Sequence, residues 1–103
     1  MTPTLWACPI GNGEVCAYPN PGRGRIHFLA KVEGQVRIQV VIFNISGEKV
    51  ARLESVGNGA ENGVTLVWEC KTMAAGIYFC QVIAKDPSAR LVLDKKLKVA
   101  VLH

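Results

Sequence analysis

An alternation of apolar and polar residues over positions 36–43 constrains the fold of this 103-residue chain more than any other feature. Successive side chains of a β-strand point to opposite faces, so every second residue from Val36 to Ile42 shares one apolar face. Val41 and Phe43 make the far end of the second face apolar as well. We therefore expect this end to be buried on both sides or to touch a partner.

The same period of two returns along most of the chain. Further strands are predicted over 26–32, 48–53, 64–69, 76–84 and 91–102. Gly47 supplies a position of positive φ in the turn at 44–47, and Gly76 is expected to open its strand where a side chain would crowd the connection. Residues 54–63 resemble a polar loop, and no helical period occurs. About seven short strands with frequent turns indicate an all-β sandwich.

The first 24 residues differ from the rest. Four of the five prolines lie there, and proline excludes regular helix and central strand. The sequence thus predicts a single domain with a Pro/Gly-rich N-terminal arm or loop at 1–24 and the sandwich at 25–103.

The four cysteines are even in number and lack the spacing of a zinc site. Two disulfides in an oxidising compartment are expected, with three possible connectivities; four buried free thiols are the alternative. If the strands at 64–69 and 76–84 are neighbours, Cys70 and Cys80 lie near enough to bridge, which leaves Cys8 with Cys16.

Composition argues against several classes of function. The net charge is +4, but the basic residues are spread along predicted strands and aromatics make up only 7%, so no nucleic-acid partner is expected. A membrane span needs about 20 consecutive apolar residues, and every apolar run in the sequence is much shorter, so no membrane insertion is expected. The N-terminus lacks the features of a signal peptide, which suggests a mature product or a domain cut from a longer secreted protein.

Catalysis is not expected either. The two histidines, His27 and His103, have no serine in a nucleophile-elbow context, and the carboxylates are scattered singly. The glycine-rich stretches lack the helix and lysine of a phosphate-binding loop. We predict no enzyme activity, no cofactor and no metal.

Several short motifs stand in a distinctive order. Tyr-Pro-Asn-Pro at 18–21 precedes the strand at 26–28, Asn-Ile-Ser-Gly-Glu-Lys-Val follows at 44–50, and Ala-Gly-Ile-Tyr-Phe stands at 75–79. Over residues 18–101 this order resembles the C-terminal sorting domain of type IX secretion, and equally the immunoglobulin-like domain of flagellar hook-capping proteins. The first 17 residues, Cys70 and Cys80 depart from the pattern. The residues that match the family motifs are Tyr18, Pro19, Asn20, Pro21, Gly47, Trp68, Gly76, Tyr78, Lys95 and Lys96.

The resemblance implies an immunoglobulin-like sandwich that is read by the secretion machinery and is not used for catalysis. The first hypothesis is therefore a sorting and surface-attachment domain of a secreted bacterial protein, exported through the periplasm to the cell surface or beyond. Each motif residue also has a structural explanation; Trp68 and Tyr78, for example, are expected to anchor the core.

Two alternatives stay open. A mean hydropathy of +0.22 fits a subunit that assembles with copies of itself into a homo-oligomer, filament or surface layer by β-strand addition, through the N-terminal arm or the strand at 91–102. A carbohydrate- or protein-binding accessory module would need an exposed aromatic platform, for which Trp6 and Tyr18 are the candidate pair.

Overall fold

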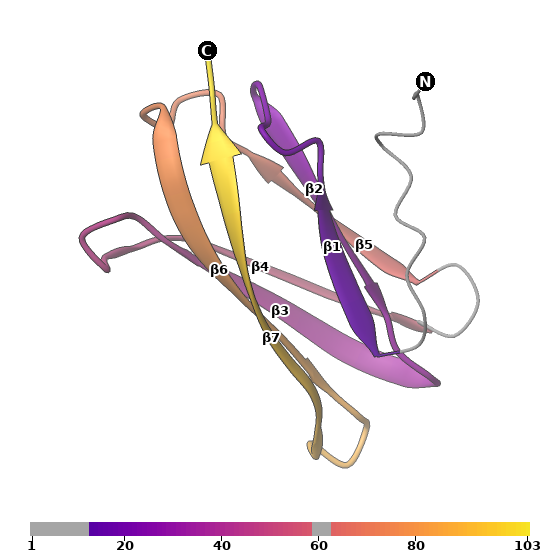
Figure 1. Ribbon diagram of the computed structural model, residues 1–103. Helices are drawn as coiled ribbons and strands as arrows, with labels where there is room; N and C mark the ends of the chain where they lie inside the picture. The colour runs from indigo at the N-terminus through magenta and orange to yellow at the C-terminus, as the bar shows by residue number, and fades with distance from the viewer. Residues whose placement is uncertain (1–12, 59–62) are drawn as a thin grey trace.

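A computed structural model of the chain describes residues 13–58 and 63–103 (Figure 1). Seven strands account for most of these residues. They are β1 (Glu14–Tyr18), β2 (Arg25–Lys31), β3 (Gln35–Phe43), β4 (Lys49–Asn58), β5 (Val64–Glu69), β6 (Gly76–Lys85) and β7 (Leu91–Val101).

The strands form two sheets, which Figure 1 shows as two layers. One sheet has three strands in the order β1-β2-β5, and the other has four in the order β4-β3-β6-β7. All neighbouring strands are antiparallel. The predicted immunoglobulin-like sandwich is confirmed.

The core lies between the two sheets and follows the predicted alternation. Every second side chain of β3, from Val36 to Ile42, is buried, as is every second one of β5, from Val64 to Trp68. Phe28 of β2 is the largest fully buried side chain. Each Å² of apolar surface removed from water stabilises the fold by about 25 cal/mol, so this interior is the main stabilising feature of the sandwich.

One corner of the sandwich is fixed by an aromatic pair. Trp68 and Tyr78 are 3% and 6% exposed, and their rings meet edge to face with centroids 5.3 Å apart. The Tyr78 hydroxyl donates to the Ala74 carbonyl at 2.6 Å, inside the connection between β5 and β6. A tyrosine bonded to backbone just upstream is a corner typical of immunoglobulin-like sandwiches. The predicted role of both residues as core anchors is confirmed.

Two segments differ from the sequence prediction. Residues 14–18, expected in the arm, form β1, which lies at the edge of its sheet. Residues 54–58, expected in a loop, extend β4, also an edge strand. An edge strand is paired on one side, so it tolerates the polar and glycine residues that resemble a loop.

The prediction of a Cys70–Cys80 disulfide is wrong. The condition for it fails, because β5 and β6 are not neighbours but belong to opposite sheets. Both cysteines are free thiols in the core, 0% and 2% exposed. Cys8 lies outside the described residues, so its pairing with Cys16 stays a prediction.

Candidate recognition surface

The Tyr-Pro-Asn-Pro segment links the two sheets. It follows β1 of the three-stranded sheet, with cis peptide bonds before Pro19 and Pro21, and its side chains reach β7 of the other sheet. The Asn20 amide donates from Nδ2 to the Lys98 carbonyl at 3.2 Å, and its Oδ1 accepts from the Ala100 N–H at 3.0 Å. One side chain thus takes the place of a paired strand at the edge of β7.

Gly22 continues this contact with its backbone. Its N–H donates to the Ala100 carbonyl and its carbonyl accepts from the Leu102 N–H, both at 2.9 Å. A Cβ on Gly22 would lie 2.2 Å from a side-chain carbon of Ile26, so a larger residue does not fit without movement. We call residues 19–22 the clamp, because they cover the edge of β7 from Lys98 to Leu102.

Beside the clamp, β7 carries three lysines. Lys96 and Lys98 point to the outer face of the four-stranded sheet, opposite Gln81 and Phe79 of β6. Lys95 stands opposite the buried Val82 and so points to the inner side of the sheet, yet it is exposed. An inward-pointing charge on an edge strand discourages strands that carry no complementary charge from adding there.

The outer face next to these lysines is apolar. Phe79 lies opposite Phe43 of β3 and is 45% exposed, and Ile77 beside it is 39% exposed. Val41 and Phe43 are half-buried here, and the expectation that a partner touches them remains a prediction.

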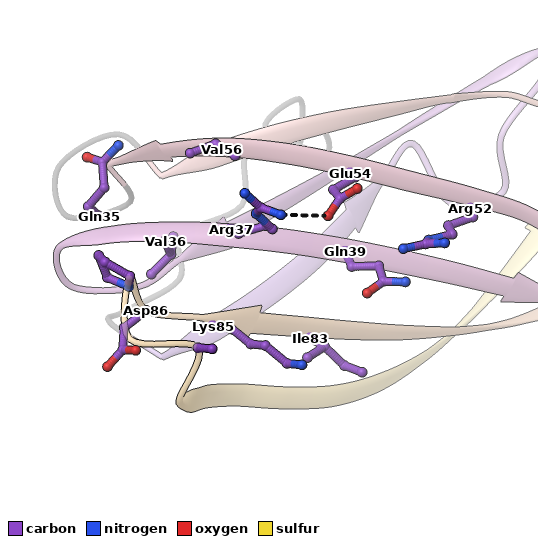
Figure 2. A pocket seen from close by; sticks show the side chains of 12 residues that line it. Gln35, Val36, Arg37, Gln39, Arg52, Glu54, Val56, Ile83, Lys85 and Asp86 are labelled. Carbon is purple, nitrogen blue, oxygen red and sulfur yellow. Dashed lines mark ion pairs between the residues drawn. The ribbon is translucent and has the colours of Figure 1, made fainter.

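A groove of about 620 Å³ crosses β4, β3 and β6 farther along the same face (Figure 2). Its charges are of both signs: Arg37 forms an ion pair with Glu54 at 3.9 Å, while Lys85 and Asp86 line the opposite side. The Asp86 carboxylate accepts from backbone N–H groups of its own turn. The described residues hold no cluster of metal-ligating side chains. The groove is therefore mixed in character, with apolar side chains such as Val56 and Ile83 beside charges of both signs, and it favours no single ligand.

A scan against protein families matches residues 16–97 to the secretion system C-terminal sorting domain. The chain belongs to this family, the sorting domains of type IX secretion. A search of curated proteins gives no match. The family match supports a C-terminal sorting signal that accompanies export.

The match to the sorting domain begins within β1 and ends within β7, so it includes both the clamp and Lys95 and Lys96. These two motifs lie at opposite ends of the sequence and meet at one edge of the folded domain. Backbone pairing with a distant strand leaves no local pattern in the sequence. The three residues that complete the contact were therefore not predicted; they are Gly22, Lys98 and Ala100.

Other motif residues of the sorting domain support the fold away from this edge. Gly47 has φ of 85° in the β3–β4 turn, as predicted. Gly76 has φ of 150° with open space around it, so its backbone conformation, and not the expected crowding, explains the glycine. Trp68 and Tyr78 form the corner described above.

Tyr18 of the sorting domain stacks on His27, with ring centroids 5.1 Å apart on the outer face of the three-stranded sheet. Trp6 lies outside the described residues, so the predicted Trp6–Tyr18 platform is untested. The described part of the chain contains no helix with the length and hydropathy needed to cross a bilayer.

Proposed function

We propose that this chain is the non-catalytic sorting and surface-attachment module of a secreted bacterial protein, and that the secretion machinery reads the edge formed by the clamp and β7. The observation that carries the proposal is the convergence of the two motifs. Asn20 bonds to residues 98 and 100, directly beside Lys95 and Lys96, although about three quarters of the chain separates them.

This convergence makes the proposed signal a property of the folded domain. In an extended chain the clamp and the lysines are far apart, whereas the sandwich holds them at one edge through hydrogen bonds of 2.9 to 3.2 Å. A receptor that contacts both motifs at once therefore recognises the folded sandwich. A preformed surface of this kind also lowers the entropic cost of binding.

The proposal is tested by fusing the full chain to the C-terminus of a periplasmic reporter in a host with a working type IX system. We expect the reporter at the cell surface or in the medium, and in the periplasm of an isogenic host that lacks the system. Retention of the reporter in the periplasm of both hosts contradicts the proposal.

The contribution of the lysines is tested with a pair of double variants. Lys95→Gln with Lys96→Gln should reduce export of the fusion, because both changes fall on the proposed edge. Lys49→Gln with Lys71→Gln removes the same charge from β4 and from the β5–β6 connection, and should export normally. Equal export of the two double variants contradicts a role for the β7 lysines.

Surface attachment is measured in the same cells. The fraction of reporter that stays with intact cells and is accessible to external protease reports attachment, and the fraction in the medium reports release. The family match supports neither the filament nor the binding-module alternative.

A further inference from the structure

The clamp covers only one end of the β7 edge. The backbone groups that it contacts are the Lys98 carbonyl, the N–H and carbonyl of Ala100, and the Leu102 N–H. All belong to even-numbered residues, which therefore direct their backbone groups away from β6. The pairing of β7 with β6 stays in register from Val101 back to Leu93.

By the same alternation, Asp94 and Lys96 direct their N–H and carbonyl groups to this edge, and Lys98 directs its N–H there. None of these groups pairs with any residue in the described ranges 13–58 and 63–103. Within the described part of the chain, the edge of β7 thus has unpaired backbone groups from Asp94 to the Lys98 N–H, immediately beside the clamp. An open edge offers a template for an additional strand.

The charge along the open edge selects which strand fits. Residues 94–98 contain three lysines and one acidic residue, Asp94, which accepts a hydrogen bond from Gln81 Nε2 at 3.2 Å. A second β7 placed here would set lysines against lysines, and like charges directly opposite destabilise a strand pair. Acidic side chains on the incoming strand replace this repulsion with attraction.

The apolar surface next to the lysines adds a second requirement. Lys96 and Lys98 lie on the outer face of β7, and the half-buried Leu97 between them lies on its inner face, so an incoming strand that alternates acidic and apolar residues places its acidic side chains beside the two lysines and its apolar side chains beside Leu97. An anionic lipid surface would neutralise the lysines but would provide no partner for the unpaired backbone groups. The open edge therefore favours a protein strand over a membrane.

We propose that residues 94–98 of β7 accept an extended acidic segment of a partner protein by β-strand addition. This inference rests on the proposed function, since it names how the same edge is recognised. Main-chain hydrogen bonds supply affinity in this mode, and the lysines supply specificity.

The test uses the full chain and a blocked ten-residue peptide of alternating valine and glutamate. Amide hydrogen exchange and NMR shifts are followed during titration. We expect slowed exchange at Asp94, Lys96 and Lys98, binding that weakens with salt, and no binding of a valine–lysine peptide. Protection of these amides before peptide is added, or binding at another surface, overturns the inference.

Lys96→Pro is the informative variant. It removes an N–H that points to the open edge, a position at which an edge strand tolerates proline, so the domain should still melt cooperatively. We expect affinity for the peptide to fall about tenfold or more, as for the loss of one or two hydrogen bonds. Lys96→Glu should also lose binding. Its charge control is Lys49→Glu, on β4 at the opposite edge of the sheet, which should bind the peptide normally. Unchanged binding by both Lys96 variants overturns the inference.

Two further measurements distinguish the proposed acidic strand from other molecules that could bind this edge. Protection of the β7 amides that rises with protein concentration in the absence of peptide identifies a second copy and overturns the proposed chemistry. So does binding to vesicles of anionic lipid with no protection of these amides.

Export distinguishes the inference from the proposed function. If the unmodified fusion is not exported, the proposed function fails. If the unmodified and Lys96→Pro fusions are exported equally, strand addition fails while the sorting function stands.

Discussion

Asn20→Ala should loosen the clamp from β7 and lower the stability of the whole sandwich. The variant removes hydrogen bonds of 3.2 and 3.0 Å to Lys98 and Ala100. Each hydrogen bond has a net worth of about 0.5–1.5 kcal/mol, and at this exposed site water replaces the lost partner, so we expect a loss of about 1–2 kcal/mol. For a domain of this size that lowers Tm by roughly 4–16 °C.

The assay compares this variant with Asn44→Ala by urea unfolding and amide exchange. Asn44 also makes side-chain hydrogen bonds, accepting from the Ser46 and Glu48 backbone and donating to the Glu48 carboxylate, but all lie within the β3–β4 turn. Both variants should lose similar stability. Only Asn20→Ala should speed exchange at the Ala100 amide, because only Asn20 bonds to β7.

Two results refute this reasoning. A stability of Asn20→Ala equal to that of the unmodified chain shows that the clamp contributes nothing to the fold. Unchanged exchange at Ala100 shows that its N–H is not held by Asn20 in solution.

The remaining predictions concern the core and one turn. Tyr78→Phe should lower the free energy of unfolding by about 1–2 kcal/mol because the Ala74 carbonyl loses its donor, whereas Tyr18→Phe should change it little; equal effects in urea unfolding contradict the corner bond. Burial raises the pKa of Cys80 from 9.0 to about 12, so the thiol stays protonated in the folded chain while it ionises in the unfolded chain. The contribution of Cys80 to stability is therefore full well below pH 9 and falls as pH rises, by about 1.4 kcal/mol at pH 10. Between pH 8 and pH 10, Cys80→Ala should lose about 1.4 kcal/mol less than the unmodified chain in unfolding experiments, and the loss due to Cys70, whose pKa burial also raises, should remain in both. Ala89, at φ of 65°, is in the left-handed region, so Ala89→Gly should stabilise the chain by about 1 kcal/mol, and a lower Tm contradicts this.

The interior strands were predictable because burial on one face imposes a period of two. β3 and β6 alternate along their length, and each is paired on both sides. β1 and the end of β4 were not predictable in this way. They are edge strands with side chains that are half-buried or exposed, so no apolar alternation marks them.

The assignment of strands to sheets was beyond the local pattern. The connection between β5 and β6 has the length of a hairpin loop but crosses from one sheet to the other. A hairpin would have made Cys70 and Cys80 neighbours, and the crossover separates them. Long-range pairing depends on the whole core, whereas periodicity reports only which side of each strand is buried.

The candidate surface was predictable as a set of residues but not as a site. The resemblance selected Asn20, Lys95 and Lys96 without placing them together. Their meeting depends on hydrogen bonds between residues about 80 positions apart in sequence, and local spacing carries no information about such bonds.

Lys95 bears on both hypotheses about this chain, self-assembly and recognition by another protein. From the sequence, the strand at 91–102 was a candidate for self-assembly by β-strand addition, whereas the resemblance to sorting domains implied recognition by the secretion machinery. The structure places the Lys95 side chain on the inner side of an open edge strand, opposite the buried Val82. A neutral or basic strand that adds there meets this charge with no counterion, and an identical β7 brings a second set of lysines. A strand that carries an acidic side chain on its inner side, beside Lys95, meets the same charge as a partner. The residue that opposes filament growth is thus the one that discriminates in favour of an acidic receptor, and specificity of this kind requires both the repulsion and the attraction.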